Sequence, residues 1–267
     1  MSSKSPDRWL ALGDYTSARI ALGRTGVSAT TANHLQFQLD HARARDAVHQ
    51  AFDPLALAAQ CKTALAGISN ALFPEQVLCS LAANRQTYLQ RPDLGRQLPE
   101  AQWQLLRDQA TGQPPIDVAL IIGDGLSSAA IAAHAVAVLR LLAPALHKRG
   151  LQLGPLCIAS QARVALADDI GEALKAKLSV MLIGERPGLS SPDSLGMYIT
   201  YGPQRGRSDA ERNCISNIRT GGLGYSQAVD TALYLLQGAI RKGLSGTILK
   251  DESTNFDVAA RGIPFLK

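Results

Sequence analysis

Two short stretches, 160–164 (SQARV) and 184–191 (GERPGLSS), each follow directly on an apolar run that is typical of a buried strand. The runs are residues 155–160 and 178–184. In open parallel sheets, ligands bind in the crevice outside the carboxyl ends of the strands. The sequence therefore predicts a ligand site to which both stretches contribute.

The segment between the two runs has the pattern of an amphipathic helix. Ala167, Ile170 and Leu174 recur at helical spacing, and we expect this face to be buried. Two buried strands joined by a helix form a parallel pair with a right-handed crossover. We place the charged residues of the segment on the opposite, exposed face; they are Asp168, Asp169, Glu172 and Lys175.

Glu185 and Cys214 are the side chains best suited to contact a ligand. Glu185 ends a buried run, where a carboxylate can accept hydrogen bonds from a polar ligand, and a local salt bridge with Arg186 is the simpler alternative. Cys214 lies among polar residues in RNCISN, unlike Cys157, although a half-buried thiol is the commoner case. No Ser-His-Asp order, H-E-x-x-H or G-x-S-x-G pattern occurs, so we predict no complete catalytic set in this chain.

A glycine-rich turn, GDGLSS at residues 123–128, lies between a predicted strand at 118–122 and a predicted helix. Such turns bind dinucleotide phosphates, because glycine lets the backbone approach and the helix N-terminus favours an anion. Two features depart from an NAD site: Ser128 replaces the third glycine, and no acid lies near the end of the next strand. Arg163 lies there instead, and a cation at this position is compatible with an NADP site. A helix N-cap at Asp124 is an equally good interpretation.

Composition limits the kinds of partner. The chain has 267 residues, a formal net charge of +5 and only 5% aromatic residues, and its basic residues are mixed with acids, so nucleic-acid binding is a weak interpretation. No uninterrupted apolar stretch reaches the roughly 18 residues that a membrane span needs. The N-terminus lacks the apolar region of a secretory signal, and we therefore expect a cytoplasmic protein.

Metal and disulfide chemistry have little support in the sequence. The four cysteines are widely separated and form no C-x-x-C pair, which argues against a zinc site and a disulfide framework. His34, His41 and His49 lie on a helix that we expect to begin near Thr30, with an apolar face through Leu35, Leu39, Ala42 and Val48. No ligand set is completed around them, so we predict no metal site and exposed histidines.

The pattern along the chain predicts an N-terminal helical region, residues 1–113, and an α/β domain, residues 114–267, with the linker TGQPP between them. Strands alternate with helices in the second part, which predicts a doubly wound, Rossmann-like, mainly parallel sheet. Residues 53–80 fit either a helix or a poorly packed insertion. We expect a helix with Ile131, Ala135, Val138 and Leu142 on one stripe and a break or kink at Pro144. Strands should follow at 195–201 and through 214–218. A last helix is expected at 227–241, capped by Ser226 and closed by Gly243.

Several motifs together resemble the small (light) subunit of ethanolamine ammonia-lyase. They are SARIALGRTG, TYLQRPDLGRQL, DVALIIGDGLSS, DDIGEALKAK, LIGERPGLSSPDSLGMY and ERNCISNIRTGG, in this order, over roughly residues 14–50 and 81–250. The segments GERPGL and CISNI are specific to that family. Residues 53–80 and the tail after Asp251 depart from it.

The resemblance implies a hetero-oligomer in which a large subunit binds ethanolamine and this chain helps to hold adenosylcobalamin at the interface. By likeness, the cofactor-contacting residues are Val164, Glu185 and Cys214, and residues 1–113 pack on the large subunit. The D-x-H-x-x-G motif of base-off cobalamin proteins does not occur, so we expect the cofactor's own base to stay on cobalt. The implied reaction is the radical conversion of ethanolamine to acetaldehyde and ammonia.

Two other functions are open at this stage: an NADP-dependent oxidoreductase that uses GDGLSS, and a purely structural assembly subunit. Some members of the family carry an amphipathic extension for a bacterial microcompartment. No comparable helix is expected before Arg8, so we expect the cytoplasm, with encapsulation as the alternative.

Overall fold

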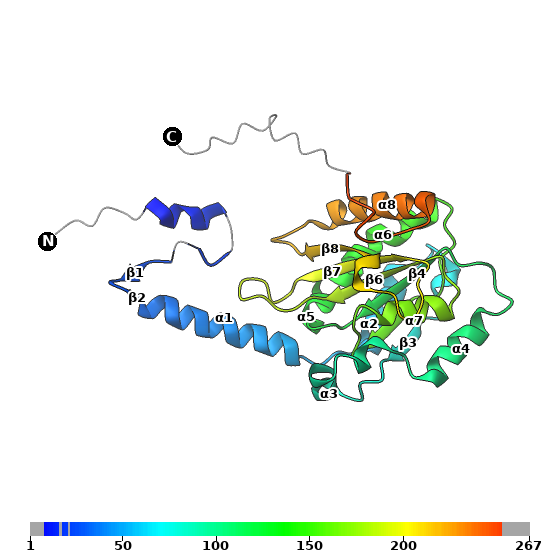
Figure 1. Ribbon diagram of the computed structural model, residues 1–267, viewed down its shortest axis with the longest axis horizontal. Helices are drawn as coiled ribbons and strands as arrows, with labels where there is room; N and C mark the ends of the chain where they lie inside the picture. Colours follow the sequence, from blue (N-terminus) through cyan, green and yellow to red (C-terminus); the bar gives the residue numbers. More distant parts are fainter. Residues whose placement is uncertain (1–7, 16–17, 21, 253–267) are drawn as a thin grey trace.

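The computed structural model describes residues 8–15, 18–20 and 22–252 (Figure 1). The α-helices are α1 (Thr31–His49), α2 (Pro54–Ala64), α3 (Arg85–Gln90), α4 (Glu100–Ala110), α5 (Ser128–Ala130), α6 (Val136–Lys148), α7 (Leu166–Ala173) and α8 (Tyr225–Lys242). The strands are β1 (Arg24–Thr25), β2 (Ser28–Ala29), β3 (Gln76–Cys79), β4 (Val118–Gly123), β5 (Cys157–Ser160), β6 (Leu178–Gly184), β7 (Leu195–Tyr201) and β8 (Arg212–Ile218). Short 3₁₀ turns and one π-helical turn, Ile131–Ala135, complete the described chain.

A six-stranded sheet organises the molecule, in the order β3-β5-β4-β6-β7-β8. The first four strands are parallel, β7 runs antiparallel to β6, and β8 runs antiparallel to β7. Because β8 reverses direction a second time, its carboxyl end lies at the same edge of the sheet as that of β6. This edge is where a parallel sheet binds ligands.

Helices cover both faces of the sheet, which confirms the predicted doubly wound α/β class. Alternate residues of β4 show the two faces: Val118, Leu120 and Ile122 pack into the core with α2, α6 and α8, whereas Ala119 and Ile121 pack into the core with α4 and α7. All six residues of β4 are buried. A continuous apolar run is therefore the correct signature of this central strand.

Residues 53–80 belong to the core of the sheet domain. Asp53 caps α2 by accepting hydrogen bonds from Leu55 N and Ala56 N, and Leu57 and Cys61 are buried between α2 and the sheet. Strand β3 then pairs with β5 at the sheet edge. The segment that the sequence leaves undecided is thus one helix and the edge strand, and β3 is an exception to the helical pattern that we predict for residues 1–113.

Helix α1 extends away from the sheet (Figure 1). Thr30 caps it, as predicted, by accepting a hydrogen bond from Asn33 N. Its apolar face is largely uncovered within this chain, since Leu35 is 63% exposed and Leu39 is 46% exposed. Ala47 is the buried residue of the helix, and all three histidines of α1 are exposed.

The strand–helix–strand unit at 155–184 differs from the prediction in two respects. Strands β5 and β6 are parallel but not adjacent, because β4 lies between them and pairs with both. Asp168 and Asp169 are not on an exposed face: they are 2% and 3% exposed. Two arginines pair with these carboxylates: Arg205, from the segment that joins β7 to β8, pairs with Asp169, and Arg212, at the start of β8, pairs with Asp168.

The helical run Ser128–Lys148 is long and apolar enough to cross a membrane, and half of its most apolar window is buried inside the protein. The predicted buried stripe is confirmed, since Ile131, Ala135, Val138 and Leu142 all have zero exposure. Such burial is typical of the core helix of a globular domain. The helix does not end at Pro144 but continues to Lys148.

The last helix matches the prediction closely, with one correction at its start. Gly243 closes α8 in the left-handed conformation, with φ of +66°. The helix begins at Tyr225 with Gly224 as its N-cap, so Ser226 is not the cap.

Candidate functional site

A cavity of about 380 Å³ lies at the carboxyl edge of the sheet, where the loops after β4, β5 and β6 meet. Val164 and Glu185 both line it, whereas Cys214 does not. The two stretches that the sequence singles out therefore meet at one place. The lining residues are Tyr88, Gly125, Leu126, Arg163, Val164, Ile183, Gly184, Glu185, Arg186 and Tyr198.

Glu185 holds three hydrogen bonds through its carboxylate. Ser194 Oγ donates to Oε2 over 2.5 Å, Ser216 Oγ donates to Oε1 over 2.5 Å, and Asn217 N donates to Oε2 over 3.1 Å. The predicted alternative, a salt bridge with Arg186, is not among the ion pairs of the described residues. The carboxylate is thus fixed in direction by donors from two different elements, the loop before β7 and strand β8.

Cys214 lies beside the cavity and is connected to it through Tyr198. The two residues are directly opposite each other in the β7–β8 register, so their side chains lie on the same face of the sheet. Although Cys214 is exposed as a residue, burial of its sulfur raises the pKa of the thiol, and the side chain of Tyr198 partly offsets this. All three predicted residues therefore belong to one region, with Tyr198 as the link that the sequence does not reveal.

The GDGLSS turn is packed against the end of β6. Gly125 has φ of +59°, and a Cβ at this position would lie 2.1 Å from Gly184 O. A Cβ on Gly184 would equally lie 2.1 Å from Ser127 O. Leu126 N donates to Gly184 O over 2.9 Å. The end of β6 therefore packs closely against one side of this turn, while Gly125 and Leu126 also line the cavity.

Asp124 does not cap the helix, contrary to the second interpretation of this turn. The cap is Ser127, whose Oγ accepts from Ala130 N. Asp124 Oδ1 instead accepts from Ala162 N over 2.9 Å, and Oδ2 lies 3.4 Å from Arg85. Burial raises the pKa of the Asp124 carboxyl, while Ala162 N and Arg85 act in the opposite direction. Asp124 thus ties the end of β4 to the loop after β5.

Named relatives are similar in sequence to this protein over most of its length. A family model described as "Ethanolamine ammonia-lyase light chain (EutC)" matches residues 6–250. The "Ethanolamine ammonia-lyase small subunit" of Pseudomonas fluorescens (strain SBW25) is 51% identical over 250 residues, which cover 93% of this chain and 88% of that protein. The protein of the same name from Ralstonia nicotianae (strain ATCC BAA-1114 / GMI1000) is 50% identical over 244 residues, 91% of this chain and 88% of that protein.

The chain belongs to the ethanolamine ammonia-lyase light chain family. The family match includes residues 53–80, which the sequence alone sets apart as a departure. This agrees with the structure, in which α2 and β3 are part of the common core.

Two residues that sequence reasoning misses support the cavity: Tyr88 lines it, and Arg85 stacks on the Tyr88 ring. Tyr88 is fully buried, and its ring lies between two guanidinium groups, 4.2 Å from Arg163 and 4.8 Å from Arg85. Arg85 also donates to Gly125 O over 2.7 Å, so this stack holds the glycine-rich turn. Both residues come from α3, which follows the edge strand β3 and precedes the other strands of the sheet. The motif TYLQRPDLGRQL contains Tyr88 but begins after Arg85, and no local pattern predicts such a contact.

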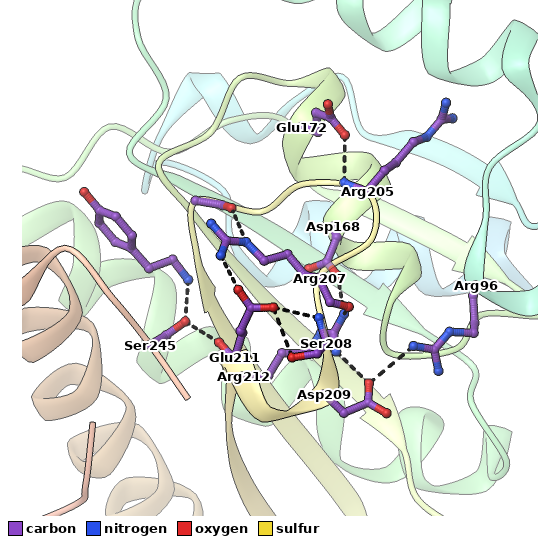
Figure 2. Close-up of polar contacts among 12 residues, drawn as sticks. Arg96, Asp168, Glu172, Arg205, Arg207, Ser208, Asp209, Glu211, Arg212 and Ser245 are labelled. Carbon is purple, nitrogen blue, oxygen red and sulfur yellow. Dashed lines mark hydrogen bonds and ion pairs between the residues drawn. The ribbon is translucent and has the colours of Figure 1, made fainter. Parts of the chain in front are cut away.

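A second polar cluster of the light chain lies at the opposite edge of the sheet and is a structural network (Figure 2). The buried guanidinium of Arg212 pairs with Asp168 and with Asp209, which is 2.6 Å away. Arg212 also donates to Arg207 O. Glu211 accepts from Arg207 and from Ser208 N. The network fixes the β7–β8 connection onto α7, and no described cavity opens onto it.

Proposed function

We propose that this chain is the small subunit of an adenosylcobalamin-dependent ethanolamine ammonia-lyase and forms one wall of its cofactor site. The observation that carries the proposal is the placement of Val164 and Glu185 on one cavity, with Cys214 joined to it through Tyr198. The carboxyl edge of a parallel sheet is a recurrent ligand position. The family membership supplies the name of the reaction.

The size and chemistry of the cavity suit a part of the cofactor. Pockets that take a drug-sized ligand have volumes of about 300–1,000 Å³, and a cobalamin is larger than such ligands. A cavity of about 380 Å³ can therefore accommodate a fraction of the corrinoid, and the rest must be covered by another chain. The lining combines the apolar Val164, Leu126 and Ile183 with the polar Glu185, as a ring edged with amide groups would require.

The residues of this chain bind and orient in this proposal. Adenosylcobalamin, when bound, supplies the radical chemistry that converts ethanolamine to acetaldehyde and ammonia. Glu185 accepts hydrogen bonds from amide N–H groups, and its fixed direction lowers the entropy cost of binding. Val164 provides apolar contact and excludes water. We expect the cofactor to keep its own base on cobalt, since the chain has no D-x-H-x-x-G motif.

The N-terminal part supplies the surface for the large subunit. Leu35 and Leu39 share one face of α1 and are 63% and 46% exposed, and exposed apolar patches mark interaction sites. The helix makes little contact with the sheet (Figure 1). Burial of these side chains by the large subunit would also place the cavity at the subunit interface.

Reconstitution with the large subunit tests the proposal. Co-expressed subunits are titrated with adenosylcobalamin, followed by absorbance, and ethanolamine deamination is measured for the complex and for each chain alone. We expect activity in the complex only. Glu185→Ala should weaken cobalamin binding about tenfold, as loss of a charged hydrogen-bond acceptor does. The matched control is Glu75→Ala, because Glu75 precedes β3 at the opposite edge of the sheet.

Three outcomes would contradict the proposal. Activity of the isolated chain would show that it is autonomous. Equal cobalamin affinity of the wild-type and Glu185→Ala complexes would support a purely structural assembly subunit. Saturable binding of NADPH would favour the oxidoreductase interpretation.

A further inference from the structure

His134 is a buried histidine that the proposed cofactor wall does not use directly. It lies in the π-helical turn Ile131–Ala135, and its side chain is 5% exposed. Both ring nitrogens have partners: Nδ1 lies 2.8 Å from Tyr225 Oη and Nε2 lies 3.1 Å from Asp193 Oδ2. π-Helical turns occur frequently at functional sites, because the extra residue re-aims a side chain.

The partner Asp193 lies in the loop that follows Glu185. Three consecutive residues of this loop are anchored from three different elements. Pro192 O accepts from Ser127 Oγ over 2.8 Å, Asp193 contacts His134, and Ser194 Oγ donates to the Glu185 carboxylate. The loop therefore connects the buried helix turn to the cavity carboxylate.

We propose that His134 is a positioning residue: through Asp193 it holds the 186–194 loop so that Ser194 keeps Glu185 aimed at the cofactor cavity. The identity of the ligand in this inference rests on the proposed function; the anchoring of the loop does not. A ligand-binding carboxylate that is fixed before the ligand arrives binds more tightly, because less freedom is lost on binding.

The hydrogen-bond chemistry assigns a direction to the contact. A carboxylate only accepts, so His134 Nε2 carries the proton and donates to Asp193. In the neutral ring, Nδ1 then accepts from the Tyr225 hydroxyl, which sits at the start of α8. Glutamine has an N–H donor that can replace Nε2, whereas alanine has none. His134→Gln is therefore the conservative variant and His134→Ala the disruptive one.

The alternative is that His134 only fills the core between α8 and the sheet. A core role would lower stability and leave the cavity unchanged, so stability alone cannot separate the two. Hydrogen exchange of the backbone amides reports on the loop, at residues 188–191, 193 and 194. The apparent KM for adenosylcobalamin reports on the cavity. Thermal unfolding reports on the core.

The experiment uses the complex of both full-length subunits. In His134→Ala we expect faster exchange of the loop amides. The apparent KM for adenosylcobalamin should rise about tenfold, whereas kcat at saturating cofactor should stay within about twofold of the wild type. His134→Gln should bring the KM back to within about threefold of the wild type. His147→Ala, at the exposed end of α6, is the matched control and should leave both measurements unchanged. In a Glu185→Ala background, His134→Ala should add little to the loss of affinity, because the two residues act in series.

Asp193→Ala provides a second test if His134→Ala does not fold, since Asp193 is 41% exposed. Unchanged loop exchange and unchanged KM in Asp193→Ala or in His134→Ala would overturn the inference. Additive effects of His134→Ala and Glu185→Ala would also overturn it. If the wild-type complex binds no cobalamin, the proposed function fails, while the exchange measurement still decides whether His134 holds the loop.

Discussion

Ser216 donates a hydrogen bond of 2.5 Å to the carboxylate of Glu185, 31 positions away in the chain. Glu185 follows β6 and Ser216 lies in β8, so the contact crosses the intervening strand β7. Gly196 of β7 makes this crossing feasible, because a Cβ there would lie 3.1 Å from both Cγ and Oε1 of Glu185. The cavity carboxylate is therefore held by β8 across the space that Gly196 of β7 leaves open.

Replacement of Ser216 by alanine tests the importance of this contact. Hydrogen bonds to charged groups contribute about 1.5–3 kcal/mol, and the partial exposure of this one reduces the expected loss of stability to about 1 kcal/mol. The variant should also weaken cobalamin binding by the complex, because Glu185 becomes less fixed. Urea unfolding and an absorbance titration measure the two effects. Ser226→Ala, on an exposed position of α8, should change neither, and an effect of equal size there would contradict the prediction.

Gly125→Ala should destabilise the protein strongly. The left-handed φ of +59° disfavours alanine, and the added Cβ would meet Gly184 O at 2.1 Å, where backbone cannot easily move. We expect a loss of more than about 2 kcal/mol in the free energy of unfolding. Gly23→Ala is the control, since nothing lies within 4 Å of its Cβ position. Similar urea midpoints for the two variants would show that the close packing of the turn is wrong.

The Arg212–Asp168 pair should respond very differently to single and double replacement. Both side chains are 2% exposed, so Arg212→Met leaves a buried carboxylate without its partner, at a cost of about 3–5 kcal/mol. The double variant Arg212→Met with Asp168→Leu should recover most of this loss, because neither member of the pair is left buried without its partner. Arg96→Met removes an exposed pair with Asp209 and should cost less than about 1 kcal/mol. Equal losses in the single and double variants, measured by urea unfolding, would contradict this account.

Glu211 should make the stability contribution of the network depend on pH. Hydrogen bonds from Ser208 N and Arg207 lower the pKa of its carboxyl from 4.5 to about 2. A group with a lowered folded-state pKa stabilises the protein above its unfolded pKa, and this contribution is lost as the pH falls. The stability difference between the wild type and Glu211→Gln should therefore shrink as the pH falls from 4.5 towards 2. A difference that stays constant over this window, measured by chemical unfolding, would contradict the assignment.

The sequence predicts the individual strands well, because their signals are local. Leu178–Gly184 and Leu195–Tyr201 are apolar runs bounded by turn residues, and both strands are observed with these limits. The joint placement of Val164 and Glu185 follows from the rule for parallel sheets, and the structure places both on one cavity.

Features that depend on distant segments could not be predicted in the same way. The position of β4 between β5 and β6 is a matter of strand order, which no local pattern encodes. Asp168 and Asp169 have the composition of an exposed helix face but are buried, where Arg212 from the start of β8 and Arg205 from the β7–β8 connection pair with them. A run of charged residues predicts an exposed helix face, and this prediction is wrong for α7 because a later segment of the chain covers that face.

Alkylation of Cys214 tests its place beside the cavity. Iodoacetamide reacts with the thiolate. Because the pKa of the Cys214 thiol is raised, its alkylation should be slow at pH values below that pKa and should become faster as the pH rises. Tyr198→Phe removes the hydroxyl that lowers this pKa, and the rate near pH 8.5 should fall about threefold. Exposed Cys79 serves as the internal reference, with both sites read by mass spectrometry. In the complex, adenosylcobalamin should protect Cys214 and not Cys79; equal protection of both, or of neither, would place Cys214 away from the cofactor.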